Sequence, residues 1–245
     1  MRIMESDMRM NIVVTPTLLL VFFFGLFVSP CVLLAELSMP DGFSCSEALS
    51  LDAYPKLLSN IDAKYKDMSL LAADFRQASY MVGLDDTKLA RGHLLFSKPG
   101  KMNWVYEEPQ AKQFVADGQT SWEYDADLRQ VFIRDFSSTF SSQLPVAFLL
   151  GIGRVSEDFV VKSACRTSRG LLLSLSPKVA SQDISSFSLL VDPKDFYPTG
   201  VRMVDVGGNE TTIGLSGLVF NTHIDPNAFV FEIPKGVYIE DQRKR

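Results

Sequence analysis

The sequence predicts a mainly β domain of the α+β class that begins with one helix. Beyond residue 69, apolar and polar residues alternate with period two, which is typical of strands with one face in an apolar space and the other in water. Turn-forming residues separate these runs at short intervals, which favours an antiparallel meander over βαβ units. Of the 245 residues, 47% are hydrophobic and 22% are charged, so a packed core is expected and disorder is not.

The first segment of the chain differs from the rest. Residues 17–35 are almost wholly apolar and follow two arginines, which predicts a secretory signal peptide cut after the last alanine. An uncleaved anchor is the main alternative, since the run is about as long as a minimal bilayer span. A lipid attached at Cys31 is another, although Pro30 stands where a small residue is expected. We therefore expect a signal peptide over residues 1–35, one domain over residues 36–245, and localisation in the periplasm.

A helix is expected over residues 46–68. Its apolar residues recur at three- and four-residue steps, which places them on one helical face. Ser44 or Ser46 could cap its start, and Pro55 could kink or delay it. The residues of this apolar face are Leu49, Leu57, Leu58, Ile61, Tyr65 and Met68.

Strands are expected to follow, each with one apolar face and separated by turn residues. Turns are predicted at residues 98–101, at Asp117-Gly118 and at residues 125–127. The apolar faces comprise Leu71, Ala73 and Phe75; Leu94 and Phe96; Met102, Trp104 and Tyr106; Trp122 and Tyr124; and Val131 and Ile133. Residues 142–153 are apolar nearly all round and predict a short helix against apolar surface. Further strands are predicted at residues 159–162, 170–176, 186–192, 200–206, 211–220 and 228–233.

Residue patterns for catalysis or metal binding are missing from the sequence. The two histidines, His93 and His223, are far apart and lack the spacing of a zinc site. The sequence contains no nucleophile elbow and no phosphate-binding glycine loop. Acidic pairs at residues 85–86 and 125–127 fall in predicted turns, where Asp is common. We therefore expect no enzyme activity, no metal and no cofactor.

Charge and cysteine content bear on which classes of partner and which cellular compartment the sequence favours. The net charge of −5 comes without a basic patch, so nucleic acid is not expected as a partner. Cys45 and Cys165 could pair in an oxidising compartment, or could be two separate small apolar residues. Eleven aromatic residues lie between residues 75 and 140. This excess fits either a core filled by side chains or a barrel that holds one ligand, and periodicity does not separate the two.

Several motifs, taken in order and spacing, resemble the LolA family of periplasmic outer-membrane lipoprotein carriers. They are Phe75-Arg-Gln77, the run from Gly92 through Lys98-Pro99-Gly100 to Trp104, Asp117-Gly118 through Trp122-Glu-Tyr124-Asp125, Gln130-Val131, and the close from Pro234 to Asp241-Gln242-Arg243. The resemblance covers nearly the whole chain from about residue 48. It implies an incomplete antiparallel β-barrel with a helical lid over an apolar cavity, the lid being residues 46–68 and 142–153.

The resemblance also implies site residues. The family places a basic residue before the proline of its strand–turn motif to hold the lid, and Lys98 stands there, with Arg91 as a second candidate. Met102 matches an apolar position near the cavity mouth. With the strand faces above, the expected cavity and rim residues are Phe75, Leu94, Phe96, Met102, Trp104, Trp122, Phe148 and Leu149.

The function implied is that of a periplasmic chaperone that carries acylated lipoproteins from the inner to the outer membrane. Expected partners are an inner-membrane LolCDE-type ABC transporter and an outer-membrane acceptor such as LolB, and the carrier is expected to be a monomer. The alternatives are a related half-barrel that binds another lipid or senses mislocalised lipoprotein, and a membrane-tethered acceptor. An esterase is disfavoured because the nucleophile elbow is missing.

Overall fold

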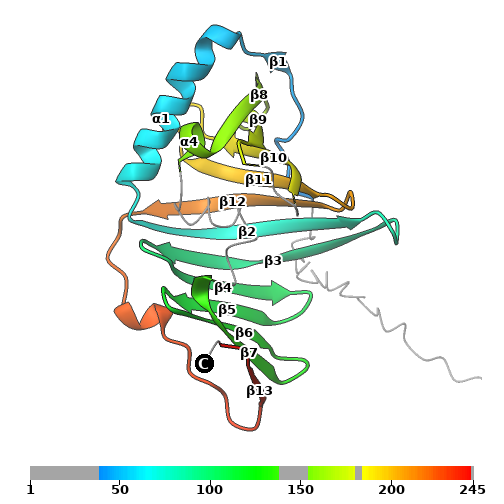
Figure 1. The fold of residues 1–245 in the computed structure, drawn as a ribbon, viewed down its shortest axis with the longest axis vertical. Coiled ribbons are helices and arrows are strands. Elements are labelled where there is room, and N and C mark those ends of the chain that lie inside the picture. Colours follow the sequence, from blue (N-terminus) through cyan, green and yellow to red (C-terminus); the bar gives the residue numbers. More distant parts are fainter. Residues whose placement is uncertain (1–38, 138–153, 180–183, 244–245) are drawn as a thin grey trace, which may run out of the picture. The chain divides into compact units, whose positions relative to one another are not determined.

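A computed structural model describes residues 39–137, 154–179 and 184–243, which belong to one compact unit, Glu36–Arg245. These residues form a mainly β fold around one sheet of 13 strands in the order β1-β8-β9-β10-β11-β12-β2-β3-β4-β5-β6-β7-β13 (Figure 1). The strands are β1 Glu47–Ala48, β2 Leu70–Met81, β3 Asp86–Ser97, β4 Lys101–Glu108, β5 Lys112–Asp117, β6 Thr120–Asp125, β7 Gln130–Asp135, β8 Phe159–Arg166, β9 Leu171–Pro177, β10 Ile184–Val191, β11 Pro198–Asp205, β12 Glu210–Phe220 and β13 Tyr238–Asp241.

Strands β2 to β7 form the predicted antiparallel meander. The predicted turns join β3 to β4, β5 to β6, and β6 to β7. In the second of these, Asp117 Oδ1 accepts hydrogen bonds from the backbone N–H groups of Gln119 and Thr120 at 2.8 and 2.7 Å. Gly118 has a φ of 98° there, a conformation that glycine adopts without steric cost.

Strands β8 to β12 form a second antiparallel meander, and β12 pairs with β2 to join the two halves. Within the described residues β1 lies at one end of the sheet and β13 at the other, and the two do not pair. The sheet is therefore open, in agreement with the incomplete barrel that the resemblance implied.

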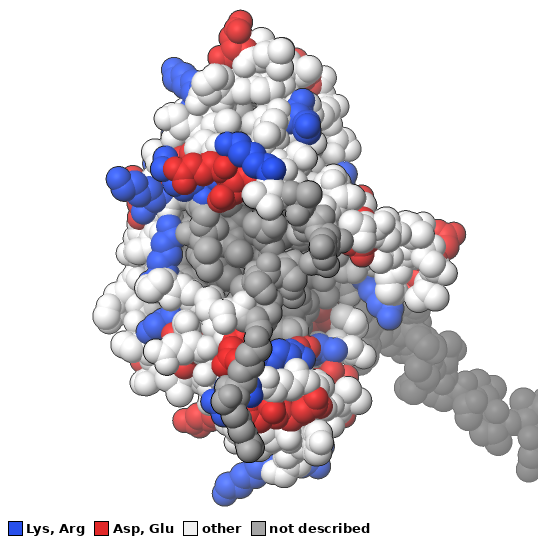
Figure 2. Space-filling model, viewed as in Figure 1, with Lys and Arg blue, Asp and Glu red and all other residues white. Residues whose placement is uncertain are grey.

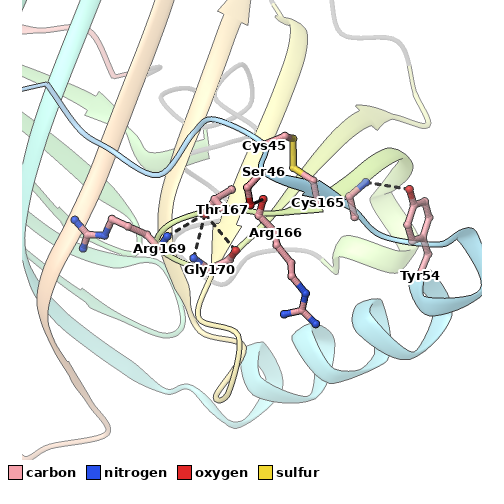
Figure 3. The surroundings of a disulfide bond; sticks show 9 residues. Cys45, Ser46, Tyr54, Cys165, Arg166, Thr167, Arg169 and Gly170 are labelled. Carbon is pink, nitrogen blue, oxygen red and sulfur yellow. Dashed lines mark hydrogen bonds between the residues drawn. A yellow bond between two sulfur atoms is a disulfide. The ribbon is translucent and has the colours of Figure 1, made fainter.

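The first helix starts later than the sequence predicted. Residues 47–48 pair with β8 as β1, Leu51–Ala53 form a 3₁₀ turn (η1), and α1 covers only Tyr54–Asp67. The early residues are held in extended form because Cys45 is disulfide-bonded to Cys165 in β8 (Figure 3). Pro55 lies in the first turn of α1, where its missing N–H costs no helical hydrogen bond.

The C-terminal region also departs from the prediction. Residues 228–233 are not a strand, since a 3₁₀ turn, η2 Pro226–Phe229, is followed by irregular chain. Beyond it β13 pairs with β7 in parallel, an exception to the antiparallel rule. The reason is topological: the chain crosses from β12 to the far end of the sheet before it pairs again (Figure 1).

Cross-strand register divides the sheet into two faces. One face, here called the concave face, carries Phe75, Leu94 and Trp104 together with Val201 and Leu189. On the β8–β12 half this face is filled: it packs against Leu57, Ile61 and Tyr65 of α1 in one apolar cluster. The predicted apolar face of the helix is thus confirmed for these residues.

The opposite, convex face is covered by the two terminal segments. Residues 40–43 lie over β8–β12, where Phe43 packs with Leu172 and Leu190. Residues 221–237 lie over β4–β7, where the Trp122 ring stacks on Phe231 with centroids 6.2 Å apart. Neither covering segment was foreseen from sequence.

Two of the predicted elements, the signal peptide at residues 1–35 and the helix at residues 142–153, lie outside the described residues. In the described part of the chain, no helix combines the length and the apolarity that crossing a bilayer requires. Charged side chains of both signs are interspersed on the face drawn in Figure 2, with no large basic field among the residues coloured there.

Candidate functional site

A cavity of about 400 Å³ opens on the concave face where α1 does not fill it. Its walls come from β2, β4 to β7, β11 and β12, which shows that the open sheet curves around this space. The lining residues are Gln77, Met102, Trp104, Tyr106, Phe114, Val115, Ser121, Trp122, Glu123, Arg134, Met203, Thr211 and Ile213. The volume falls in the range of roughly 300–1,000 Å³ that is usual for small-molecule sites.

Trp104 in β4 is the centre of an aromatic wall. Its ring meets Phe75 edge-on at 5.1 Å and Phe96 at 5.8 Å, and it stacks on Tyr106 at 5.9 Å. Such pairs orient one another through their quadrupoles as well as by apolar area. Phe114 continues the wall on β5, against the edge of Tyr106.

Polar groups on the cavity wall are paired with one another. The Tyr106 hydroxyl donates to Gln77 Oε1 at 2.8 Å, and burial raises the pKa of that phenol, so it stays neutral and remains a donor. Arg134 Nη1 lies 2.9 Å from Glu123 Oε2, and its Nε donates to Gln242 near the C-terminus at 2.8 Å. The cavity therefore has an aromatic side on β4 and a charged side on β6 and β7.

The predicted site residues fall into three groups. Met102 and Trp104 border the cavity, and Phe75, Leu94 and Phe96 are buried beside Trp104 on the same face. Phe148 and Leu149 lie outside the described residues.

Trp122 is a separate case. It borders the cavity, but its register partners Val115 and Ile133 place its side chain on the convex face, where its ring stacks on Phe231. The sequence was right that Trp122 and Tyr124 share a face. The face of β6 directed into the cavity is nevertheless the one with Ser121 and Glu123.

Lys98 contacts the helix that the resemblance names as the lid. Its Nζ donates a hydrogen bond to the backbone carbonyl of Tyr65, close to the C-terminal end of α1. That carbonyl belongs to the last turn, where helical acceptors lack an internal partner and a cation is favoured by the helix dipole. Burial lowers the pKa of the Lys98 ammonium, and the negative charge of Asp67 partly opposes this shift.

Arg91, the second candidate for holding the lid, pairs with a neighbouring strand in the described part of the chain. Its Nη2 lies 2.5 Å from Glu108 Oε1 on the neighbouring strand, so within the described chain it forms a cross-strand ion pair instead. The hydrogen bond and the charge of Glu108 raise the pKa of Arg91 further. Arg91 is six residues before the end of β3, whereas α1 is contacted at that end, and residues 142–153, the other part of the expected lid, lie outside the described residues.

Asn221, which sequence analysis missed, holds the same end of α1. Its Nδ2 donates to the Asp67 carbonyl at 3.0 Å, while its Oδ1 accepts from the backbone N–H groups of Ser69 and Leu70 at 2.8 and 3.2 Å. The residue has a φ of 51°, a conformation that Asn tolerates better than most residues. The only sequence signal was an Asn directly after a strand, which is too common to single out.

A second space, of about 1170 Å³, runs along the other side of α1 toward β8. Apolar side chains of α1 and β8 line it, together with Lys66, Lys98, Arg154 and Lys178. Asp62 at its base is buried and accepts from the Val155 N–H at 2.9 Å, which ties α1 to the short helix α4 Val155–Asp158. We read this space as an open groove beside the lid helix.

Other side chains that were considered for catalysis or metal binding make structural contacts. His93 is exposed and lies 3.4 Å from Glu107, and no group of three or more metal-ligating side chains occurs in the described ranges. Asp125 caps its turn by accepting from the Leu128 N–H at 3.0 Å and pairs with Lys112 at 2.9 Å. Both contacts hold the pKa of its carboxyl below the ordinary value, so it stays ionised.

Comparisons with known proteins agree with this geometry. Residues 66–232 match the family model "Outer membrane lipoprotein carrier protein LolA". An outer-membrane lipoprotein carrier protein of Chromobacterium violaceum is 30% identical over 189 residues, which cover 77% of this chain and 89% of the relative. One of Cupriavidus pinatubonensis is 33% identical over 156 residues, covering 64% and 72%. A crystal structure of an uncharacterized conserved protein from Thermus thermophilus has the same fold, with a TM-score of 0.51, 13% identity, and coverage of 78% of this chain and 99% of that one.

Proposed function

The chain belongs to the LolA family of outer membrane lipoprotein carrier proteins, and we propose that it carries acylated lipoproteins across the periplasm to the outer membrane. The observation that carries this proposal is the cavity on the concave face, whose aromatic wall lies beside a helix held at one end by Lys98 and Asn221. The chain acts by binding and release, and it catalyses no reaction.

The physical need for such a carrier follows from the cost of exposing acyl chains to water. Each exposed methylene costs ~0.8 kcal/mol, so about 45 methylenes on a lipoprotein anchor cost roughly 30 kcal/mol or more. Free diffusion between two membranes is therefore prohibited. A carrier must cover the chains and also release them, which favours an adaptable site lined by aromatic rings and by Met102 and Met203.

The compartment is indicated by a separate feature, the disulfide. The disulfide between Cys45 and Cys165 fits an oxidising compartment such as the periplasm. Residues 1–35 act as the export signal, and the mature carrier is a single domain, residues 36–245, that works as a monomer. A LolCDE-type transporter supplies cargo, and an acceptor such as LolB receives it where one is present.

The lid includes α1, which moves to admit cargo. A cavity of about 400 Å³ lies at the small end of the usual range, so an anchor with several acyl chains requires the space to widen. Lys98 and Asn221 hold only the C-terminal end of α1, near the start of β2. Movement of α1 about that end would enlarge the concave side without breaking the sheet.

The proposal is tested by loading. Spheroplasts or transporter proteoliposomes that hold a labelled lipoprotein are incubated with the purified chain, and soluble complex is separated by size and identified by mass spectrometry. The proposal expects one lipoprotein per carrier, dependent on ATP in the proteoliposomes. Intact mass of the exported protein must correspond to a chain that begins at Glu36 without lipid; an added lipid would favour a tethered acceptor.

Two variants test whether cargo contacts the cavity wall. Met102→Glu introduces a charge on the wall beside Trp104 and should reduce loading at least tenfold, whereas Leu84→Glu changes an exposed residue at the β2–β3 turn and should not. Thermal unfolding of both variants separates lost binding from lost folding. Unchanged loading by a folded Met102→Glu variant would show that this wall does not receive the cargo.

A further inference from the structure

Trp104 carries a polar group for which the protein provides no partner. The residue is 5% exposed, and its indole nitrogen Nε1 is buried without a hydrogen-bond acceptor in the part of the chain that the structure describes. A buried N–H that lacks an acceptor has lost water without replacement, and folded proteins rarely tolerate this. Such a donor beside a cavity points to an acceptor on the molecule that fills the cavity.

The polar groups near Trp104 bond to one another and not to its indole N–H. The Phe75 and Phe96 rings offer only carbon. The Tyr106 hydroxyl donates its proton to Gln77 Oε1, and the Gln77 amide nitrogen donates to Ser79. Among the described wall residues, Trp104 Nε1 is therefore the buried side-chain donor that lacks an acceptor.

The position of Trp104 also fits the chemistry of an acyl group. On the concave face Trp104 is paired across β4 and β5 with Phe114, and Phe114 across β5 and β6 with Glu123. The aromatic side and the Glu123–Arg134 pair are therefore two strands apart, or roughly 10 Å at the usual strand spacing. If the hydrocarbon of an acyl chain lies on the aromatic side and its polar end points to the charged side, its carbonyl would pass close to Trp104.

We infer that Trp104 Nε1 donates a hydrogen bond to the carbonyl oxygen of an acyl chain in the cavity, so that the site recognises ester- or amide-linked acyl chains and not hydrocarbon alone. The inference rests on the proposed carrier function and adds a specificity-determining residue to it. Within an acyl chain the carbonyl oxygen is the strong acceptor, and an ether oxygen in its place is a much weaker one. Loss of this bond should weaken binding about five- to tenfold.

The test uses synthetic lipopeptides with one chain length and one peptide. The first carries two ester-linked acyl chains on a glyceryl cysteine, the second carries the same chains through ether bonds, and the third carries a single amide-linked chain. Dissociation constants are measured with the purified mature protein. We expect the ester probe to bind at least fivefold more tightly than the ether probe, and that ratio to fall to about one in Trp104→Phe, which keeps an aromatic ring but lacks the N–H.

A second measurement is made on the wild-type protein, and the variant serves only to assign the spectrum. The chain has two tryptophans, so its indole N–H groups give two signals in a proton–nitrogen NMR spectrum, and the signal lost in Trp104→Phe identifies Trp104. The ester probe should move that signal downfield more than the ether probe does. A comparable shift with the amide probe would assign the carbonyl to an amide as well as to an ester.

The outcomes separate this inference from the proposed function. If ester and ether probes bind the wild-type protein equally and leave the Trp104 signal alike, the carbonyl contact is wrong while the carrier function stands. If neither probe binds, the carrier function and the contact both fail.

Discussion

Lys98 shows how one residue joins the sheet to the lid helix. Its backbone N–H donates to the Ser69 carbonyl at 2.9 Å, and its ammonium donates to the Tyr65 carbonyl of α1. A lysine has three donors on a flexible stem, so it reaches this carbonyl without the planar fork of an arginine. The contact shows how a lysine can serve at the basic position before the proline of this strand–turn motif.

Replacing Lys98 tests this contact. Lys98→Met keeps most of the apolar stem but leaves the Tyr65 carbonyl without its donor, and we expect the free energy of unfolding to fall by about 1–2 kcal/mol. Hydrogen exchange in the last turn of α1 should accelerate. The measurements are urea unfolding and exchange followed by mass spectrometry.

The matched control is Lys88→Met, which removes an exposed lysine from β3 and should change neither quantity. Lys98→Arg should retain most of the stability. Equal stability of Lys98→Met and the wild type would mean that the contact contributes nothing to lid closure.

The Asp125 carboxyl leads to a prediction about how stability depends on pH. Its pKa is lowered below the ordinary value of 3.8 by the Leu128 N–H and by Lys112, so its ionised form is favoured in the folded state. The resulting stability is complete above the pKa of the unfolded chain and is lost as pH falls through the lowered pKa. The stability difference between wild type and Asp125→Asn should therefore shrink below about pH 4.

Urea unfolding of both proteins between pH 3 and 7 checks this. Asp127→Asn, which removes the neighbouring carboxylate of the same turn, is the control and should follow the wild type. A difference that is constant across this range would contradict the assigned direction.

At the scale of elements, the disulfide fixes the approach to the lid. Cys45 and Cys165 are 120 residues apart in sequence, and their bond places β1 against β8. Just beyond it, the Tyr54 hydroxyl accepts from the Ala164 N–H at 3.0 Å at the start of α1 (Figure 3). The helix is thus tied to β8 near its first turn and to β2 and β12 near its last.

Breaking the disulfide should be costly because it closes a long loop. We expect the Cys45→Ser, Cys165→Ser double variant to lose about 2–4 kcal/mol of unfolding free energy. A thiol reductant should lower the melting temperature of the wild type and leave the double variant unaffected. If the reductant left the melting temperature of the wild type unchanged, the bond would be shown not to form.

Strand register decides which aromatic residues face the cavity. Period-two alternation correctly grouped Met102 with Trp104 and Trp122 with Tyr124. It did not say that the first pair is concave and the second convex. On β6 the convex face became the aromatic one because the segment after β12 supplies Phe231 to cover it.

At the scale of the whole molecule, the interior is divided. Under α1 the concave face is solid, with Leu173, Leu189 and Val191 fully buried. Toward β4–β7 the same face borders the cavity. Both readings of the aromatic excess were therefore partly right: one half of the curved sheet is a filled core and the other half encloses space.

The C-terminal segment makes that second half possible, because strands that border a cavity on one face need packing on the other. Phe229 in η2 is buried against β4 and β5, and the Asn103 side chain donates to the Ala228 carbonyl at 2.8 Å. Phe229→Ala should lower the unfolding free energy by about 2–4 kcal/mol. Val230→Ala, at an exposed neighbouring position, should change it by less than about 0.5 kcal/mol.

Urea unfolding measures both variants, and lipopeptide binding by Phe229→Ala reports whether the cavity survives. Equal stability of the two variants would show that this segment is an appendage and not part of the wall.

The sequence by itself determined most of the strands and turns, the apolar face of α1 and the family, because each is a local pattern or a set of motifs in fixed order. Tertiary structure decided what depends on residues far apart in the chain. The pairing of β12 with β2, the Cys45–Cys165 bond, the Asn221 contacts and the covering of the convex face each join segments separated by more than 100 residues. Period-two alternation predicts that two residues share a face of the sheet. Which of the two faces borders a cavity depends on which distant segments of the chain pack against the opposite face.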